Sequence, residues 1–224
     1  MAPIALETLA NGLTAVAIER PAAHQVLVVL MVRTGSRFED PAQAGISHFL
    51  EHMLFRGNGM HATSRELSLA FEQTGGMLNA TTGVESTEFY FICHPERLDQ
   101  GLEQLAGFVQ GPTFPDLEKE RQIIQDEILY DYNDHGDLVD LPTLAAQLLW
   151  PGHPLSQPIT GTPPTLAALS LDALRRYHLQ AYAPGSVVLA LAGKLQPEQA
   201  LGVVQRHFGA WPMRPPGSNG KPMP

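Results

Sequence analysis

The sequence predicts a globular protein of mixed class, with strands and helices in one chain. Asn11-Gly12 lies between two short apolar segments, a pattern typical of a β-hairpin. The β-branched run over residues 25–33 predicts a buried strand. Apolar residues at helical spacing, as over residues 46–54, predict amphipathic helices. With 224 residues, the chain can form one large or two small domains and bury a substantial core.

The first half of the chain predicts a hairpin, a strand, two helices and a second strand pair. Thr34-Gly35-Ser36 ends the strand, and Gly57-Asn58-Gly59 ends the first helix. Thr63 or Ser64 caps the second helix, which stops at Gly75-Gly76. Polar and apolar residues alternate unevenly in the second strand pair, which favours a place near a sheet edge. The strands are expected over residues 4–9, 13–18, 25–33, 78–82 and 85–93.

The second half is mainly helical. Pro95 and Phe114-Pro115 mark two helix starts, and Ser170 marks a later one. Residues 151–164 are rich in Pro and Gly and predict a loop. The helices are expected over residues 95–109, 115–132, 138–150, 170–182 and 197–208, with a last strand over 187–192. Residues 1–210 are expected to form the domain, and residues 211–224 a linker or disordered tail.

Composition excludes several classes of protein. A formal charge of -9 argues against nucleic-acid binding, which needs clustered Lys and Arg. The single cysteine, Cys93, rules out an internal disulfide framework and is expected in the core. The first residues lack the pattern of a signal peptide, and the longest apolar runs are too short to span a bilayer. We therefore expect a cytoplasmic or otherwise soluble protein with no membrane partner.

The helix around His48 carries the strongest chemical signal. His48 and His52 are four residues apart, so they lie on one helical face and can share a metal ion. Glu51 lies beside them and can reach a water on the same metal. This H-x-x-E-H order is the inverted form of the common zinc-protease helix. The alternative is a chance pair of surface or core histidines, but the strongly apolar surroundings of this helix favour a metal because buried ionisable groups need partners.

A catalytic zinc site has three protein ligands and an open position, so a third ligand is required. The predicted helix after Pro115 offers Glu118, Glu120, Asp126 and Glu127. Glu120 and Glu127 are seven residues apart and share a face, whereas Asp126 is rotated about 100° from Glu127. One of the pair can bind the metal and the other can support the site. The alternative is a solvated acidic helix.

The chain resembles the pitrilysin, insulinase and mitochondrial-processing-peptidase family of zinc metalloproteases, in the N-terminal catalytic domain. The resemblance covers nearly the whole chain, and its motifs follow the order that the family shows. They are Gly45 to Phe55 with the H-x-x-E-H core, Leu78 to Tyr90, Glu120 to Ile128, and His153 to Thr162.

The resemblance implies an α+β domain, a mostly antiparallel sheet with helices packed against it. It implies zinc bound by His48, His52 and Glu127, with Glu51 as general base and Glu120 as a second acid. The usual family spacing is two residues longer and would end on Leu129, which cannot bind zinc, so we expect a shortened connection. Family members bind extended peptides as an added strand, and here the edge would include Leu78, Asn79 and Ala80.

The expected activity is therefore hydrolysis of short or unstructured peptides by a zinc endopeptidase. Family members build a chamber from several such domains, and a later domain supplies an Arg and a Tyr that clamp the substrate. Arg175, Arg176 and Tyr177 do not match that clamp, so we expect a second homologous domain or a homo- or hetero-oligomeric partner to complete the chamber. Two alternatives are a non-catalytic scaffold subunit of the same fold and a metal-binding half that is active only after pairing.

Overall fold

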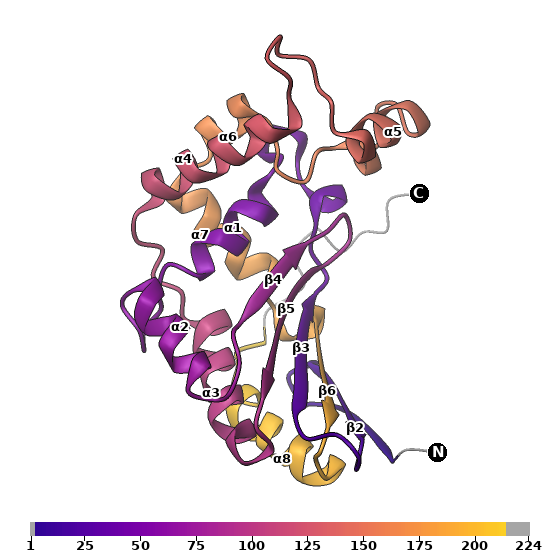
Figure 1. The fold of residues 1–224 in the computed structure, drawn as a ribbon, viewed down its shortest axis with the longest axis vertical. Helices are drawn as coiled ribbons and strands as arrows, with labels where there is room; N and C mark the ends of the chain where they lie inside the picture. The colour runs from indigo at the N-terminus through magenta and orange to yellow at the C-terminus, as the bar shows by residue number, and fades with distance from the viewer. Residues whose placement is uncertain (1–2, 214–224) are drawn as a thin grey trace.

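Six strands form a single mixed sheet in the order β1-β2-β6-β3-β5-β4 in the computed structural model, which describes residues 3–213 (Figure 1). Among these strands β2 and β6 run parallel, and the other neighbouring pairs are antiparallel. The expected α+β class with a mostly antiparallel sheet is therefore confirmed. The strands are β1 Ile4–Thr8, β2 Thr14–Glu19, β3 Val26–Val32, β4 Asn79–Thr82, β5 Thr87–Cys93 and β6 Val187–Gly193.

The main helices pack on one face of this sheet, and α8 packs against β2 at one end (Figure 1). The α-helices are α1 Ile46–Leu54, α2 Ser64–Glu72, α3 Leu98–Gln110, α4 Leu117–Ile128, α5 Leu141–Leu149, α6 Pro163–Ala168, α7 Leu171–Ala181 and α8 Pro197–Phe208. The short 3-10 helices are η1 Ser36–Phe38, η2 Pro41–Gln43, η3 Pro95–Arg97, η4 Leu129–Asp131, η5 Pro154–Ser156 and η6 Pro184–Ser186.

The hydrophobic core lies between the sheet and the helices. Alternate residues of β3 and β5 point into it because side chains in a strand alternate between the two faces. Phe89 and Phe108 meet edge to face, with ring centroids 5.2 Å apart. Each fully buried side chain of this size contributes about 1.5–3 kcal/mol by leaving water. Cys93 is fully buried in this core, as expected, and burial raises the pKa of its thiol to about 12.

The first hairpin is confirmed, but its connection is longer than the two-residue turn that Asn11-Gly12 favours. Thr8 pairs with Thr14, so residues 9–13 form the loop, with Gly12 in the left-handed region at φ 92°. The Asn11 amide donates to the backbone oxygens of Phe208 and Trp211 at 2.8 and 3.1 Å. A contact with the C-terminal end of α8 (Pro197–Phe208) and the residues after it therefore helps to determine the shape of this turn.

The helix expected from Pro115 to Tyr132 is shorter in the structure. Phe114 and Asp116 have positive φ values of 55° and 57°, so residues before Leu117 turn rather than begin the helix. The helix ends at Ile128 and continues only as η4. Likewise α5 begins at Leu141 because the Asp140 carboxylate accepts a hydrogen bond from the Thr143 amide and caps it. The loop expected over residues 151–164 contains η5 and the first two residues of α6.

The core extends to Trp211, one residue into the segment expected as a tail. Its side chain is buried, with its ring 6.2 Å from that of Phe208. Residues 214–224 of that predicted tail lie outside the described residues. Within the described range, none of the helices has the length and apolar character required to cross a membrane.

Candidate functional site

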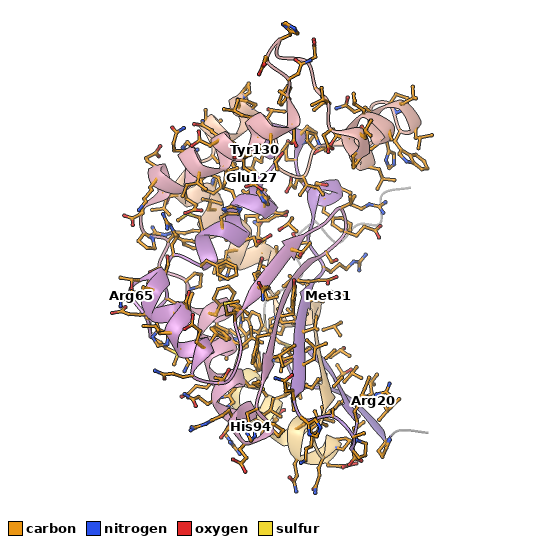
Figure 2. The ribbon with its side chains drawn as sticks, viewed as in Figure 1. Arg20, Met31, Arg65, His94, Glu127 and Tyr130 are labelled. Carbon is orange, nitrogen blue, oxygen red and sulfur yellow. The ribbon has the colours of Figure 1, made fainter. Side chains whose placement is uncertain are left out.

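Helix α1 holds the predicted histidine pair through its buried face. Phe49, Leu50 and Met53 are fully buried against the core, which determines the rotation of the helix. His48 and His52 lie on the face that points towards α4, with ring centroids 4.5 Å apart. Figure 2 shows Glu127 on α4, next to α1. The hydrophobic pattern of one short helix therefore positions both imidazoles.

A buried carboxylate caps the start of α1. Glu39 accepts hydrogen bonds from the Gly45 amide at 2.7 Å and from the Ser47 amide at 2.8 Å. These amides belong to the group at a helix N-terminus that has no partner inside the helix. Burial raises the pKa of Glu39 to about 7, although its hydrogen bonds from Ser47 and Gly45 act in the opposite direction. One of the two amides that Glu39 binds is that of Ser47, the residue directly before His48.

Hydroxyl groups connect the same turn to the sheet and to α7. Tyr177 from α7 lies 2.7 Å from Ser47 Oγ and 2.7 Å from Thr34 Oγ1. Burial raises the pKa of the Tyr177 hydroxyl, so it stays protonated. The start of α1 is thus attached to α7 and, through Tyr177, to the segment that follows β3, as well as to Glu39.

The predicted loop after His153 packs against this end of α1. Gly45 has φ 92° and Gly161 has φ 77°, and the two backbones touch. A Cβ atom on Gly161 would lie 2.3 Å from the Ala44 oxygen, so only glycine fits there. The close approach brings Ile159 and Thr160 into the wall of the pocket that also contains the histidines.

The structure brings His48, His52 and Glu127 together, as the sequence predicts. Glu127 Oε1 lies 3.7 Å from His48 Nε2, and Glu127 Oε2 lies 3.5 Å from His52 Nε2. One ligand atom from each residue lies within 4.8 Å of the others. Ligand atoms around a tetrahedral zinc are about 3.3–3.5 Å apart, because each is about 2.0–2.1 Å from the metal. The donor set and spacing therefore fit a zinc ion.

The protonation of His48 also fits a metal site. Burial, followed by the charge of His52, lowers the pKa of His48 to about 3, so this ring is neutral at neutral pH. Neutral imidazole is the form that binds metal. Burial would lower the pKa of His52 as well, but the hydrogen bond with Glu120 and the charge of Glu127 outweigh it and raise the pKa.

Glu120 contacts His52 at the ring nitrogen that does not face Glu127. Its Oε1 lies 2.9 Å from His52 Nδ1, which leaves Nε2 directed at Glu127. Arg56 Nε lies 2.5 Å from Glu120 Oε2, so the buried carboxylate has a cationic partner. A carboxylate behind a metal-binding histidine fixes the orientation and tautomer of its ring. Glu120 thus contacts His52, but it is not one of the three grouped donor residues.

Glu51 lines the same pocket, and a residue that the sequence did not single out holds it. Thr82 Oγ1 donates to Glu51 Oε2 at 2.5 Å, from the last residue of β4. Burial raises the pKa of Glu51, and the Thr82 hydrogen bond opposes that rise. The pocket has a volume of about 520 Å³ and is also lined by Thr81, Asp131 and Asp140. This hydrogen bond, between residues that are 31 apart in the sequence, shows that Thr82 faces α1.

The three residues predicted to bind substrate lie at different places along the edge. β4 is an outer strand of the sheet, as expected. Ala80 lines the pocket beside His48 and Glu51. Leu78 and Asn79 instead line a smaller pocket with Phe55 and Met77, and the Asn79 amide donates to the Met77 oxygen. Asn79 is therefore not part of the pocket that contains the histidines.

Comparison with protein families assigns the chain. Residues 14–162 match the insulinase (peptidase family M16) model, and residues 168–224 match the model of the M16 inactive domain. The chain belongs to the M16 peptidase family, which confirms the resemblance seen in the sequence.

Curated relatives support this assignment. An uncharacterized zinc protease of Bacillus subtilis (strain 168), YmxG, is 34% identical over 206 residues, covering 91% of this chain and 49% of the relative. An uncharacterized zinc protease of Rickettsia felis is 31% identical and covers 92% of this chain and 50% of the relative. The chain thus spans about half the length of these relatives.

Solved structures share the fold. A protease from Helicobacter pylori has a TM-score of 0.86 at 21% identity, over 96% of this chain and 54% of that chain. An M16-like protein from Alicyclobacillus acidocaldarius has a TM-score of 0.82 at 26% identity, over 96% and 51% of the two chains. The chain therefore shares its architecture with both solved structures, one of which is described as M16-like.

Proposed function

We propose that this chain is the catalytic half of a zinc-dependent endopeptidase that hydrolyses short or unstructured peptides. The observation that carries the proposal is the meeting of His48, His52 and Glu127 in an open pocket that also contains Glu51. Relatives named zinc proteases support the reaction class. An acidic helix without a metal role would have no reason to place Glu127 beside both imidazoles.

In this proposal each residue of the site has its own role. His48, His52 and Glu127 would hold the zinc, which when bound supplies an acidified water and polarises a peptide carbonyl. The Glu51 carboxylate would act as general base and general acid, taking up a proton and passing it to the leaving amine. Thr82 orients the Glu51 carboxylate, and Glu120 orients His52.

The peptide would lie along β4 in this proposal. β4 is an outer strand whose free edge can accept main-chain hydrogen bonds from an extended peptide. Ala80 and Thr81 of β4 line the pocket together with Glu51, so a strand bound along β4 would pass Glu51. This mode of binding favours unfolded segments, because a folded substrate has no free backbone to pair.

The proposal is tested by Glu51→Gln, with Glu103→Gln on the surface of α3 as the matched control. We expect Glu51→Gln to keep about one zinc per chain and to lose cleavage of an unstructured fluorogenic peptide, whereas the control keeps both. Full cleavage by zinc-loaded Glu51→Gln would refute the role of Glu51. A wild-type chain that binds no zinc would favour the scaffold subunit.

A half-enzyme that needs a partner is the second candidate. The coverage of only half of each curated relative favours it. A wild-type chain that binds zinc but cleaves no peptide by itself would support this candidate.

A further inference from the structure

Three adjoining cavities lie beside β4, and we call them together the groove. The pocket that contains the histidines shares Glu51 and His52 with a second cavity of about 300 Å³, the middle pocket. The middle pocket in turn shares Phe55 and Ser68 with a third cavity of about 110 Å³. We call this third cavity the far pocket and define it by Leu67, Phe71, Met77 and Leu78. The groove therefore runs from the candidate metal site past the end of α1 to α2.

The far pocket has an apolar interior. Leu67 and Phe71 are four residues apart on α2, so they share a face of the helix, and both are buried. Met77 and Leu78 lie between α2 and β4 in the sequence; Leu78 is half-buried, and Met77 is 65% exposed. An apolar cavity of about 150 Å³ holds benzene in another protein, and the far pocket is somewhat smaller. It can therefore take one aliphatic side chain of the size of Leu or Met.

Strand β4 links the two ends of the groove. Leu78 directly precedes β4 and lines the far pocket, whereas Ala80 and Thr82 of β4 line the pocket that contains the histidines. These three alternate residues share one face of the strand. At about 3.3 Å per residue, the far pocket lies about 7–13 Å along the strand from the residues beside Glu51. In Figure 1, α1 and α2 lie on the same side of β4, away from β5.

We propose that an extended peptide bound along β4 inserts one apolar side chain into the far pocket, two to four residues from the bond that is cleaved. The proposal rests on the proposed function, because it assigns a further specificity site to the same substrate. A paired strand advances at the same spacing as β4, so the separation of the two pockets along β4 sets the separation of the two sites along the peptide. The preference arises because apolar surface of the bound side chain is removed from water.

A substrate peptide is the occupant that the observations favour. The far pocket adjoins the candidate metal site through Phe55 and Ser68 of the middle pocket, so it does not belong to a separate surface. Met77 stands exposed beside the outer strand β4, and a methionine side chain adapts to partners of different shape. The far pocket should therefore accept several aliphatic residues and discriminate them from polar ones.

The probes are unstructured fluorescein-labelled peptides that share one sequence and differ only in the position of a single Leu among Ser residues. The zinc-loaded wild-type chain gives kcat/KM for each peptide, and mass spectrometry locates the cleaved bond. We expect kcat/KM to be about 10-fold higher when Leu, rather than Ser, stands two to four residues from that bond on one side of it. Fluorescence anisotropy with zinc-loaded Glu51→Gln should show the same ratio in Kd, because the far pocket acts through binding.

Met77→Glu tests the far pocket directly. Met77 is exposed, so the circular dichroism should not change, and the new carboxylate joins Glu72 in lining the far pocket. The preference for Leu over Ser should fall below about 2-fold, and Lys should become the preferred residue at this position. Ser68→Leu, which fills the pocket from α2, should remove the preference without adding a charge. Leu69→Glu, on α2 but outside the groove, is the matched control and should keep the preference.

The outcomes separate this proposal from the proposed function. A preference for Leu confined to the residue next to the cleaved bond, or one that both Met77→Glu and Ser68→Leu leave intact, would overturn the proposal. Cleavage whose rate is independent of the position of Leu would also overturn it, and it would leave the proposed function standing. If the wild type cleaves none of the peptides but binding still depends on Leu and on Met77, the far pocket is supported and the proposed function fails.

Discussion

The buried carboxylate of Glu39 should make the stability of the protein fall as the pH rises. Its pKa is raised from 4.5 to about 7 by burial, so the folded chain binds this proton more tightly than the unfolded chain. The stabilisation is complete below pH 4.5 and is lost as the pH rises through 7. A rise of this size corresponds to about 3 kcal/mol in the free energy of unfolding.

The measurement is urea unfolding of the wild type and Glu39→Gln between pH 4.5 and 8, in EDTA. Other groups titrate in this range, but they do so in both proteins and cancel in the difference. The stability of the wild type minus that of Glu39→Gln should fall by about 3 kcal/mol across this window. Glu7→Gln, at an exposed position in β1, should show no such trend. A difference that stays constant with pH would show that Glu39 does not carry a raised pKa.

Three further predictions concern the site and its support. Glu127→Gln should reduce bound zinc well below one per chain, measured by atomic emission, whereas Asp126→Asn, rotated about 100° on the same helix, should not; equal zinc in both would place the third ligand elsewhere. Thr82→Val should keep zinc but lower peptide cleavage about 10-fold, because Glu51 loses its hydrogen bond; unchanged kcat would contradict this. Phe49→Ala should cost about 3–5 kcal/mol in urea unfolding, since the ring is fully buried, and a cost below 1 kcal/mol would be inconsistent with that packing.

Two of the three grouped donor residues could be predicted from the sequence because their arrangement is local. His48 and His52 share a face by helical spacing alone, and the family motif around Glu127 identified the third residue. The Thr82 contact with Glu51 could not be predicted, since it depends on which residues of β4 and β5 pair. The parallel pairing of β2 with β6 joins segments from opposite ends of the chain, and no local pattern records it.

The Glu39 cap was missed for a related reason. A helix cap is normally sought at the residue before the first turn, which here is Gly45 with no side chain. Glu39 reaches the same amides only because η2 folds the intervening chain back. Conversely, the sequence placed a helix start at Phe114-Pro115, where the backbone adopts positive φ on both sides of Pro115 instead.

In α1 the residues that stabilise the fold differ from the residues that belong to the candidate metal site. Phe49, Leu50 and Met53 set the orientation of the helix, and the histidines emerge from its other side. A lineage can therefore replace one residue of this His/His/Glu group in a single mutational step and keep a well-folded domain. Such a descendant would retain its outer surfaces while losing the group of donor residues, so a fold of this kind can change its chemistry without redesigning the domain.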